Sequence, residues 1–208
     1  MPEPIIRFRN VHKAFGEKVI YRGVNLDVYP GETLTIMGGS GVGKSVLLKL
    51  LIRLLKADKG SITFHGEEIT TMKEGKIELV RQQIAMLFQG AALFDSMSVY
   101  ENVAFAPRRF TTMREPEIRE LVREKLEMVG LRGVEHLNPS SLSGGMQKRV
   151  GLARAIALDP EIVLYDEPTT GVDPILGAAV DDLIKSLNAK TGVTSIVISH
   201  DMASVFRT

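Results

Sequence analysis

The sequence has 208 residues, of which 44% are hydrophobic, so it can bury one substantial core, and its length favours a single domain. Lysine and arginine number 26 and aspartate and glutamate 25, and the resulting net charge of +1 excludes an overall field that would hold a nucleic acid or an anionic membrane. Cysteine is absent, which excludes disulfides, thiolate metal sites and thiol catalysis.

The amino-terminal segment does not have the pattern of an export signal. It reads MPEPIIRFRN, with acidic Glu3 and two prolines before any apolar run. The strongest apolar stretch, Val46 to Leu55, is interrupted by Lys49 and Arg53 and is far shorter than the roughly 20 residues that a membrane-spanning helix needs. We therefore expect a protein that is not exported and whose role at a membrane is peripheral.

A strand, a glycine loop and a helix follow one another in the first quarter of the chain. Val24, Leu26 and Val28 alternate with polar residues as in a strand, Pro30-Gly31 indicates a turn, and 33–37 reads as a second strand. Beyond the glycines, leucines and Val46 recur at helical spacing up to residue 55.

The loop between this strand and helix reads GGSGVGKS, a full match to the phosphate-loop pattern G-x-x-x-x-G-K-[ST]. Its glycines allow backbone amides and the helix N-terminus to surround phosphate oxygens, while the lysine reaches the outer phosphates and the serine binds Mg²⁺. The alternative is a glycine-rich turn with a solvated lysine, but the strand and helix on either side favour a nucleotide. The loop consists of Gly38, Gly39, Ser40, Gly41, Val42, Gly43, Lys44 and Ser45.

The middle of the chain, about 72–137, is predicted to be rich in helix. Short strands are expected at 61–64 and 84–88, and Ser98 with Glu101 has the spacing of a capping box. Pro116 near a start and Gly130 near an end frame a further helix.

Strand and helix alternate again in the last third. We expect a helix from about Ser143, an apolar strand at 162–165, a helix from about Pro174 and an apolar strand at 195–199. This alternation predicts a parallel sheet that is covered on both faces, and the simplest reading is one fold with a helical insert.

The strand at 162–165 ends in two acids, Asp166 and Glu167. At the carboxyl end of a buried strand Asp166 could hold Mg²⁺, while Glu167 polarises the water that attacks a γ-phosphate. Neighbouring side chains on a strand point in different directions, so both roles are geometrically possible. Alternatively, the acids simply end an apolar strand in a polar turn.

A second glycine site begins another helix. Leu142-Ser143-Gly144-Gly145-Met146-Gln147 combines a capping serine with two glycines, which is suited to binding an anion. The phosphate loop already surrounds the triphosphate of one nucleotide. The chain therefore binds two nucleotides, or one nucleotide is shared between two chains.

The sequence LSGGMQKR resembles the signature of ABC ATPases, and its position between the phosphate loop and the acid-ended strand is that of the family. The resemblance implies a P-loop NTPase parallel-sheet core with N-terminal antiparallel β strands and a helical signature-motif subdomain at about 90–155, within a single ABC ATPase domain over 1–208. It also implies a homodimer with two shared ATP sites, in which Ser143, Gly144 and Gly145 bind the γ-phosphate of the ATP held by the opposite subunit.

Four further residues match the family by position. Phe15 resembles the aromatic that stacks on adenine, Gln89 the glutamine that links Mg²⁺ to the membrane partner, Asp173 the inter-subunit aspartate and His200 the switch histidine near the γ-phosphate. Alternatively, Phe15 is a core residue, Gln89 a solvated strand end, and Asp173 and His200 helix caps.

A narrower resemblance lies in MLFQGAALFDSMSVYENVAF and LYDEPTTGVDPI, which are similar to the ATPase subunits of Mla-type, MCE-associated lipid transporters. This implies a cytoplasmic ATPase, peripheral on the inner membrane, that works with transmembrane permease subunits and an MCE-type lipid-binding protein, without nucleic acid. By the same resemblance, Phe94 and Tyr100 face the membrane partner, unless both rings belong to the core.

The chain departs from the ABC pattern in three places. Met146 stands where the signature usually has glutamine, Phe15 replaces the commoner tyrosine, and the loop 170–173 differs from the usual inter-subunit loop. None of these changes removes a phosphate or Mg²⁺ contact. The chain also ends at Thr208, whereas relatives continue through more strands and helices, so we expect the carboxyl-terminal end to be truncated.

Two other functions compete with a transport ATPase. A soluble ABC protein acting in translation or DNA repair usually carries two fused cassettes or a long coiled-coil insertion, and neither pattern is present in this sequence. A regulatory module that binds a nucleotide without hydrolysing it would not need Glu167. We therefore expect an enzyme that converts ATP and water to ADP and phosphate.

Overall fold

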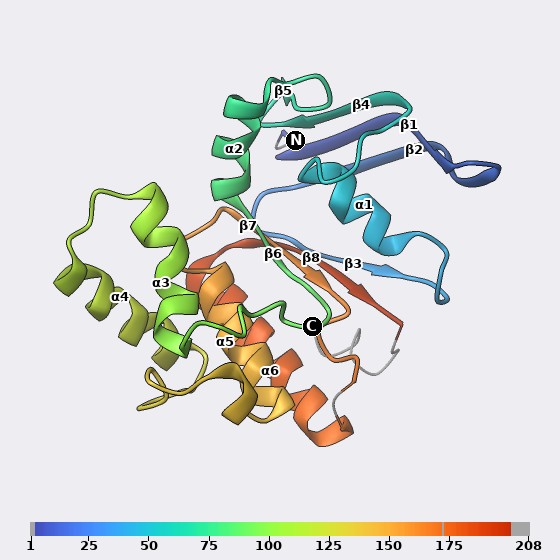
Figure 1. The fold of residues 1–208 in the computed structure, drawn as a ribbon. Helices are drawn as coiled ribbons and strands as arrows, with labels where there is room; N and C mark the ends of the chain where they lie inside the picture. Colours follow the sequence, from blue (N-terminus) through green and yellow to red (C-terminus); the bar gives the residue numbers. More distant parts are fainter. Residues whose placement is uncertain (1–2, 172, 201–208) are drawn as a thin grey trace.

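Two four-stranded sheets form the framework of the protein, which a computed structural model describes over residues 3–171 and 173–200. Figure 1 shows one sheet above the other, with helix α1 (Lys44–Leu51) between them. The fold is the predicted one, with a parallel-sheet core and antiparallel strands near the N-terminus.

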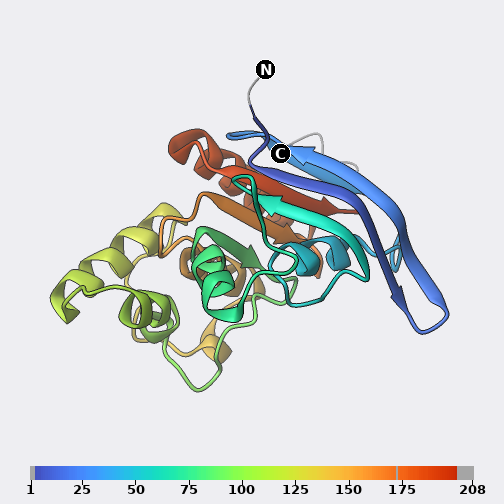
Figure 2. The same cartoon turned by 90° about the horizontal axis from the view of Figure 1, so that it is seen from above.

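The upper sheet is antiparallel and comes from the first third of the chain. Its strand order is β2-β1-β4-β5, and Phe15 pairs with Lys18 at the tip of the β1–β2 hairpin. Figures 1 and 2 both show this hairpin projecting on the side of the molecule opposite α3 and α4. Strand β2 begins six residues before Val24, where the sequence pattern had started it, because its first half pairs with β1 although it does not alternate cleanly. The strands are β1 (Ile6–Phe15), β2 (Lys18–Val28), β4 (Lys59–Phe64) and β5 (Glu67–Glu68).

The lower sheet is parallel, in the order β3-β8-β7-β6. Its strands are β3 (Thr33–Met37), β6 (Ile84–Leu87), β7 (Ile162–Asp166) and β8 (Thr194–Ser199). Because the strands are parallel, their carboxyl ends lie at one edge of the sheet, where the phosphate loop follows β3 and the paired acids end β7. The predicted strand at 33–37 is confirmed residue for residue.

Side chains of β7 and β8 alternate between two buried clusters. Leu164 and Ile198 belong to the cluster that contains α1 and the antiparallel sheet, whereas Val163 and Val197 belong to the cluster formed with the helices of the other face. The sheet is therefore covered on both faces, as the apolar runs predict.

The remaining helices are α2 (Glu74–Gln83), α3 (Val99–Phe110), α4 (Glu115–Met128), α5 (Gly144–Ala155) and α6 (Pro174–Thr191), with a short 3-10 helix at Pro139–Ser141. Helices α3, α4 and α5 contact one another. Within the described ranges, none of the helices combines the length and the apolar character needed to cross a bilayer.

The predicted helix ends agree with the structure in three places and differ in one. Ser98 and Glu101 form the capping box that starts α3, Ser143 caps α5, and α4 has Pro116 in its first turn and ends two residues before Gly130. Helix α1, however, ends at Leu51 rather than residue 55, because Arg53 adopts a left-handed conformation (φ 53°) that stops the helix.

Candidate functional site

The phosphate loop joins β3 to α1 through backbone that only glycine adopts readily. Gly43, the residue before the helix, has a φ of 107°, and a Cβ at this position would overlap the Ile20 side chain. Its carbonyl accepts a hydrogen bond of 2.6 Å from the Tyr21 hydroxyl. Burial raises the pKa of Tyr21 to about 12, so the hydroxyl remains a donor at neutral pH. The loop therefore leaves the N-terminus of α1 open toward an anion.

Lys44 lies inside this loop, with only 8% of the residue exposed. Its Nζ donates to the carbonyls of Gly38 at 2.8 Å and Gly39 at 2.9 Å. The same Nζ is 3.5 Å from Oε1 of Glu167. The ammonium is thus held at the mouth of the phosphate loop and faces the acid that ends β7.

Ser45 and Asp166 are 121 residues apart in sequence but in contact in the fold. The Ser45 hydroxyl donates to Oδ1 of Asp166 at 2.5 Å. A hydroxyl and a carboxylate oxygen are hard ligands of the kind that Mg²⁺ prefers, and Mg²⁺ usually takes one or two such protein ligands and completes its shell with water and phosphate oxygens. The pair therefore fits a Mg²⁺ ion bound beside a nucleotide.

Glu167 follows the last residue of β7 and contacts other partners than Asp166 does. Its carboxylate lies between two basic groups, Lys44 and His200, whose Nδ1 is 3.4 Å from Oε2. Glu167 has a φ of 49°, a conformation that costs a non-glycine residue about 1–3 kcal/mol and is concentrated at functional sites. The two acids are thus directed to different partners, one to Ser45 and the other to Lys44 and His200.

A cleft of about 410 Å³ is lined by eight of the seventeen predicted site residues. Ser40, Gly41, Gly43, Lys44 and Ser45 of the phosphate loop line it, together with Gln89, Glu167 and, from the β1–β2 hairpin, Phe15 and Ile20. The Phe15 ring is 45% exposed and has Nζ of Lys13 at 5.2 Å from its centroid, so it is not a core residue. An aromatic face at one end of the cleft and a cationic loop at the other match a base and its phosphates.

The signature segment lies outside this cleft. In the described part of the chain, neither Ser143 nor the two glycines after it are among the residues that line the cleft, and Ser143 and Gly144 are exposed at the start of α5. The Ser143 hydroxyl accepts a hydrogen bond of 3.3 Å from the amide of Met146. One chain therefore carries two separate glycine sites, of which only the phosphate loop opens into the cleft.

Asp173 is likewise away from the cleft lining, at the start of α6. Its Oδ1 accepts a hydrogen bond of 3.1 Å from the amide of Ile175, which is the geometry of a helix cap. This contact agrees with the capping alternative for Asp173 and leaves an inter-subunit role as a prediction.

Arg154 is a site-supporting residue that no sequence motif indicated. Its guanidinium donates to the carbonyls of Ala91 and Ala92, both at 2.8 Å, just after Gln89. Both alanines have positive φ angles, 60° and 49°, so this turn is strained and Arg154 holds it on α5. The two consecutive alanines gave no signal of a left-handed turn, which is why sequence reasoning missed it.

Phe94 and Tyr100, which are predicted to face the membrane partner, have different surroundings in the structure. Phe94 is 41% exposed, which contradicts a core position, but it packs against Phe105 at 5.1 Å between ring centroids. Tyr100 instead donates to Oε1 of Glu115 at 2.6 Å and lies under the guanidinium of Arg108. The exposed aromatic surface of this segment is therefore Phe94 with Phe105, whereas Tyr100 packs against the buried cluster of the helical face.

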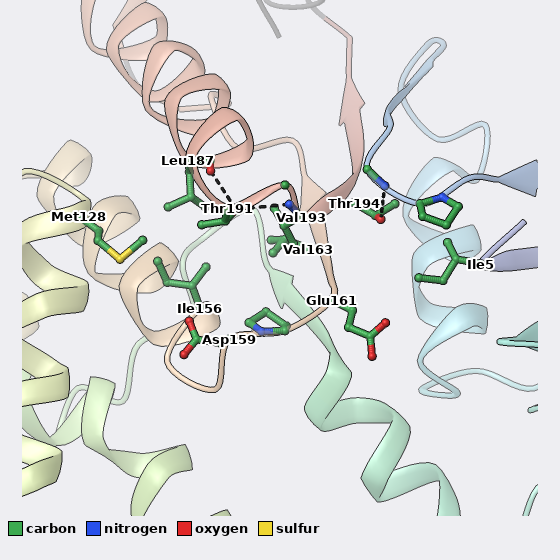
Figure 3. A pocket seen from close by; sticks show the side chains of 14 residues that line it. Ile5, Met128, Ile156, Asp159, Glu161, Val163, Leu187, Thr191, Val193 and Thr194 are labelled. Atoms are coloured by element: carbon green, nitrogen blue, oxygen red, sulfur yellow. Dashed lines mark hydrogen bonds between the residues drawn. The ribbon is translucent and has the colours of Figure 1, made fainter. Parts of the chain in front are cut away.

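A second hollow of about 410 Å³ lies at the opposite, amino-terminal edge of the parallel sheet (Figure 3). Thr194 there accepts a hydrogen bond of 2.9 Å from the amide of Gly31, and Thr191 donates to the carbonyl of Leu187 at 2.9 Å. Asp159 is paired with Lys125, and Glu161 with His65. These polar groups serve the fold, so the nucleotide cleft is the better candidate site.

Comparisons with known proteins agree with this geometry. The family model described as ABC transporter matches residues 21–170. MlaF of Haemophilus influenzae, an intermembrane phospholipid transport system ATP-binding protein, is 46% identical over 99% of this chain and 78% of its own length. The probable ribonucleotide transport ATP-binding protein mkl of Mycobacterium leprae is 44% identical over 95% of this chain, which spans only 57% of that relative.

Solved structures are similar as well. The dimeric structure of MJ0796, a bacterial ABC transporter cassette, has a TM-score of 0.89 and 31% sequence identity, covering 97% of this chain and 90% of that one. A dimeric post-hydrolysis state of the same cassette, bound to ADP and Pi, has a TM-score of 0.88 at 31% identity.

Proposed function

Because this chain belongs to the ABC transporter family of ATP-hydrolysing subunits, we propose that its cleft binds Mg-ATP and that Glu167 activates the attacking water. The observation that carries this proposal is the position of the Glu167 carboxylate, between Lys44 and His200 and beside the Ser45–Asp166 pair. We further propose that residues 1–208 form one ABC ATPase domain, with a helical subdomain at about 90–155.

The cleft contains binding groups for both the adenine and the phosphates of ATP. Phe15 stacks on the adenine, and the amides of the phosphate loop and the N-terminus of α1 surround the phosphates. Lys44 exchanges its bonds to the Gly38 and Gly39 carbonyls for bonds to the outer phosphate oxygens. The buried position of this ammonium supports the assignment, because a charge there interacts more strongly than one in water.

Ser45, Asp166 and Gln89 would hold Mg²⁺. The ion, when bound, neutralises charge on the phosphate oxygens and orients them. Ser45 and Asp166 are already in hydrogen-bond contact, and Gln89 lines the same cleft. Gln89 is exposed and follows β6, a position from which it could contact both Mg²⁺ and the membrane partner.

Hydrolysis then needs positioning and proton transfer more than covalent chemistry. Glu167 accepts a proton from water, the water oxygen bonds to the γ-phosphorus, and the bond to the β,γ-bridging oxygen breaks to leave ADP and phosphate. Lys44 and His200 stabilise the charge that develops on the γ-phosphate.

We propose a head-to-tail homodimer with two shared ATP sites. Ser143, Gly144 and Gly145 would bind the γ-phosphate of the ATP in the opposite subunit, and Asp173 would contact the partner across the interface. This proposal is supported by the exposed signature segment outside the cleft and by the dimeric state of the similar cassette.

The test of the catalytic assignment is the Glu167→Gln variant. The amide keeps the shape of the side chain but cannot accept the proton, so turnover should fall by roughly 10²- to 10⁴-fold while ATP binding persists. Phosphate release measured alongside binding of a fluorescent ATP analogue separates the two effects. Turnover within twofold of the unaltered protein would refute the role of Glu167.

We also propose that the subunit works beneath a permease in phospholipid transport, peripheral on the cytoplasmic side of the inner membrane and with an MCE-type lipid-binding protein. The 46% identity to the phospholipid-transport ATPase MlaF supports this substrate, whereas mkl carries a different substrate in its name. Affinity purification from membranes should recover a permease and a lipid-binding component together with phospholipid. Recovery of ribosomes or DNA-repair factors instead would support the soluble alternative.

A further inference from the structure

Lys148 is a buried cation on the helix that carries the signature segment. It lies four residues after Gly144 on α5, and only 8% of the residue is exposed. Its Nζ donates to two backbone carbonyls, those of Pro168 at 2.6 Å and Thr170 at 2.7 Å. Burial lowers the pKa of Lys148. An ammonium in such a place is costly unless its donors are satisfied, and here the acceptors belong to a single loop.

The loop that Lys148 binds is the continuation of Glu167. The Thr170 amide donates to the Glu167 carbonyl at 3.2 Å, which closes a tight turn over 167–170. The Thr170 hydroxyl donates to Oε2 of Glu167, also at 3.2 Å. The backbone and the carboxylate of Glu167 are therefore both tied to Thr170, whose own carbonyl is held by Lys148.

The conformation of this turn needs such support. Glu167 is in the left-handed region at a φ of 49°, and a strained backbone persists only where its surroundings hold it. Within the described residues, no carboxylate forms an ion pair with Lys148, so the ammonium is committed to the two carbonyls. A hydrophobic residue of similar volume would avoid burying the charge but could not donate to the two carbonyls, so the contribution of Lys148 is its pair of hydrogen bonds to the turn.

We propose that Lys148 is a positioning residue for ATP hydrolysis, which fixes the 167–170 turn to the signature helix and thereby aims the Glu167 carboxylate at the attacking water. The inference rests on the proposed catalytic role of Glu167. Lys148 touches neither the nucleotide cleft lining nor the carboxylate itself, so it acts through the backbone of the turn.

The experiment is a comparison of Lys148→Met, Lys148→Gln and Lys148→Arg in the full chain. Methionine keeps most of the volume but removes the donors, so kcat should fall roughly ten- to a hundredfold, since small displacements of a catalytic group have effects of this size. The KM for ATP and the binding of a fluorescent ATP analogue should change by less than about twofold, because the phosphate loop is untouched. Arginine, whose fork can reach both carbonyls, should restore most of kcat.

Lys125→Met is the matched control. Lys125 is also a buried lysine, at 3% exposure, but it lies on α4 and bonds Asp159 at 2.5 Å, away from the cleft. It should lower the thermal midpoint without lowering kcat. If Lys148→Met does not fold, Lys148→Gln is used instead, and the same fall in kcat with little change in the KM for ATP is expected. The neutral amide buries no charge but cannot bond both carbonyls.

Three outcomes overturn the inference: an unchanged kcat in the folded Met or Gln variant, a kcat loss matched by Lys125→Met, or no rescue by arginine. Glu167→Gln is measured in parallel. If that variant keeps normal turnover, the proposed function fails. If it loses turnover while Lys148→Met does not, only the positioning role fails.

Discussion

Two adjacent acids at the end of β7 have different environments because Asp166 is the last residue of the strand, whereas Glu167 is in the left-handed conformation (φ 49°) that begins the next turn. Asp166 meets the hydroxyl of Ser45, and Glu167 meets the ammonium of Lys44 and the imidazole of His200. This difference in neighbours supports the two proposed roles, Mg²⁺ binding for Asp166 and proton acceptance for Glu167. The surroundings of each acid are therefore set by a few side-chain contacts of 2.5–3.5 Å.

Lys44→Ala should weaken ATP binding by roughly 10- to 150-fold, because a hydrogen bond to a charged group contributes about 1.5–3 kcal/mol. The fold should survive, since the loop backbone and the Tyr21 bond to Gly43 remain. Titration with a fluorescent ATP analogue measures the change.

The control for Lys44→Ala is Lys49→Ala, which removes a lysine in the last turn of the same helix, α1. It should leave ATP affinity within about twofold. Undiminished affinity and turnover in Lys44→Ala would contradict the assignment of the phosphate loop.

Helix α5 organises the site at the scale of elements. Its first residues form the signature segment, Lys148 holds the turn after Glu167, and Arg154 holds the turn after Gln89. Between the two cations, Gly151 lets the helix approach the Gln89 turn closely, since a Cβ there would lie 3.0 Å from Cβ of Ala91. One helix therefore connects three functional segments that are distant in sequence.

Gly151→Ala should destabilise the protein although alanine is the better helix former. Alanine gains about 1 kcal/mol of helix propensity, but overpacking a tight contact costs about 1–3 kcal/mol. The new methyl group meets Leu87 at the end of β6 and Ala91 in the turn that follows it. We therefore expect the cost of overpacking to exceed the gain in helix propensity, and the thermal midpoint of unfolding to fall by several degrees.

Gly75→Ala provides the contrast. Gly75 is also in a helix, α2, but a Cβ there meets nothing within 4 Å. Its thermal midpoint should stay the same or rise. A rise in both variants, measured by thermal unfolding, would show that the α5 contact is looser than the structure indicates.

For the whole molecule, the main observation is that the described signature residues of one chain do not line that chain's own cleft, which supports the proposed sharing of ATP between two chains. Glu167→Gln should therefore convert the protein into a dimer that persists in Mg-ATP, because bound ATP is no longer removed and a negative charge near the γ-phosphate is lost. Light scattering with and without Mg-ATP measures the change in mass.

Combining Glu167→Gln with Ser143→Arg should return the protein to the monomer, since the signature segment can no longer accept the γ-phosphate across the interface. Lys44 and the cleft are intact in this double variant, so ATP still binds each chain. A monomer in the single variant at saturating ATP, or a dimer in the double variant, would contradict the shared-site arrangement.

The exposed aromatic pair provides a prediction about the membrane partner. Phe94 and Phe105 are 41% and 40% exposed, and the guanidinium of Arg154 lies 5.5 Å from the Phe94 ring centroid while bonding the Gln89 turn. An amphipathic segment of a permease packed on these rings would therefore act on the cleft through Arg154. Changing both rings to Ser should reduce copurification with the permease by at least about tenfold, with ATP binding unchanged.

Leu79→Ser is the control for this surface. Leu79 is 59% exposed on α2, so its substitution removes an exposed apolar side chain and leaves Phe94 and Phe105 unchanged. Permease recovery equal to that of the Leu79 variant would mean that the partner docks elsewhere. Loss of folding in the double Phe variant would favour a packing role for the rings.

The sequence by itself determined the features that depend on local chemistry. The phosphate loop between β3 and α1, the Ser98 and Ser143 caps, and the acids at the end of β7 each follow from residue types at short spacing, because turns, caps and strand ends are stabilised by hydrogen bonds within a few residues. The family resemblance then supplied the order in which these segments meet, and with it the prediction of the cleft residues.

Several contacts between residues that are distant in sequence could not be predicted. The sequence predicts that Ser45 and Asp166 share a Mg²⁺ ion, but the direct hydrogen bond between them, across 121 residues, is found only in the structure, as is the packing of Phe94 on Phe105. Lys148 and Arg154 gave no signal at all, because a lysine or arginine in a helix is ordinarily solvated and its acceptors here are carbonyls of other segments. Such contacts depend on how helices pack against the sheet, which local spacing does not encode.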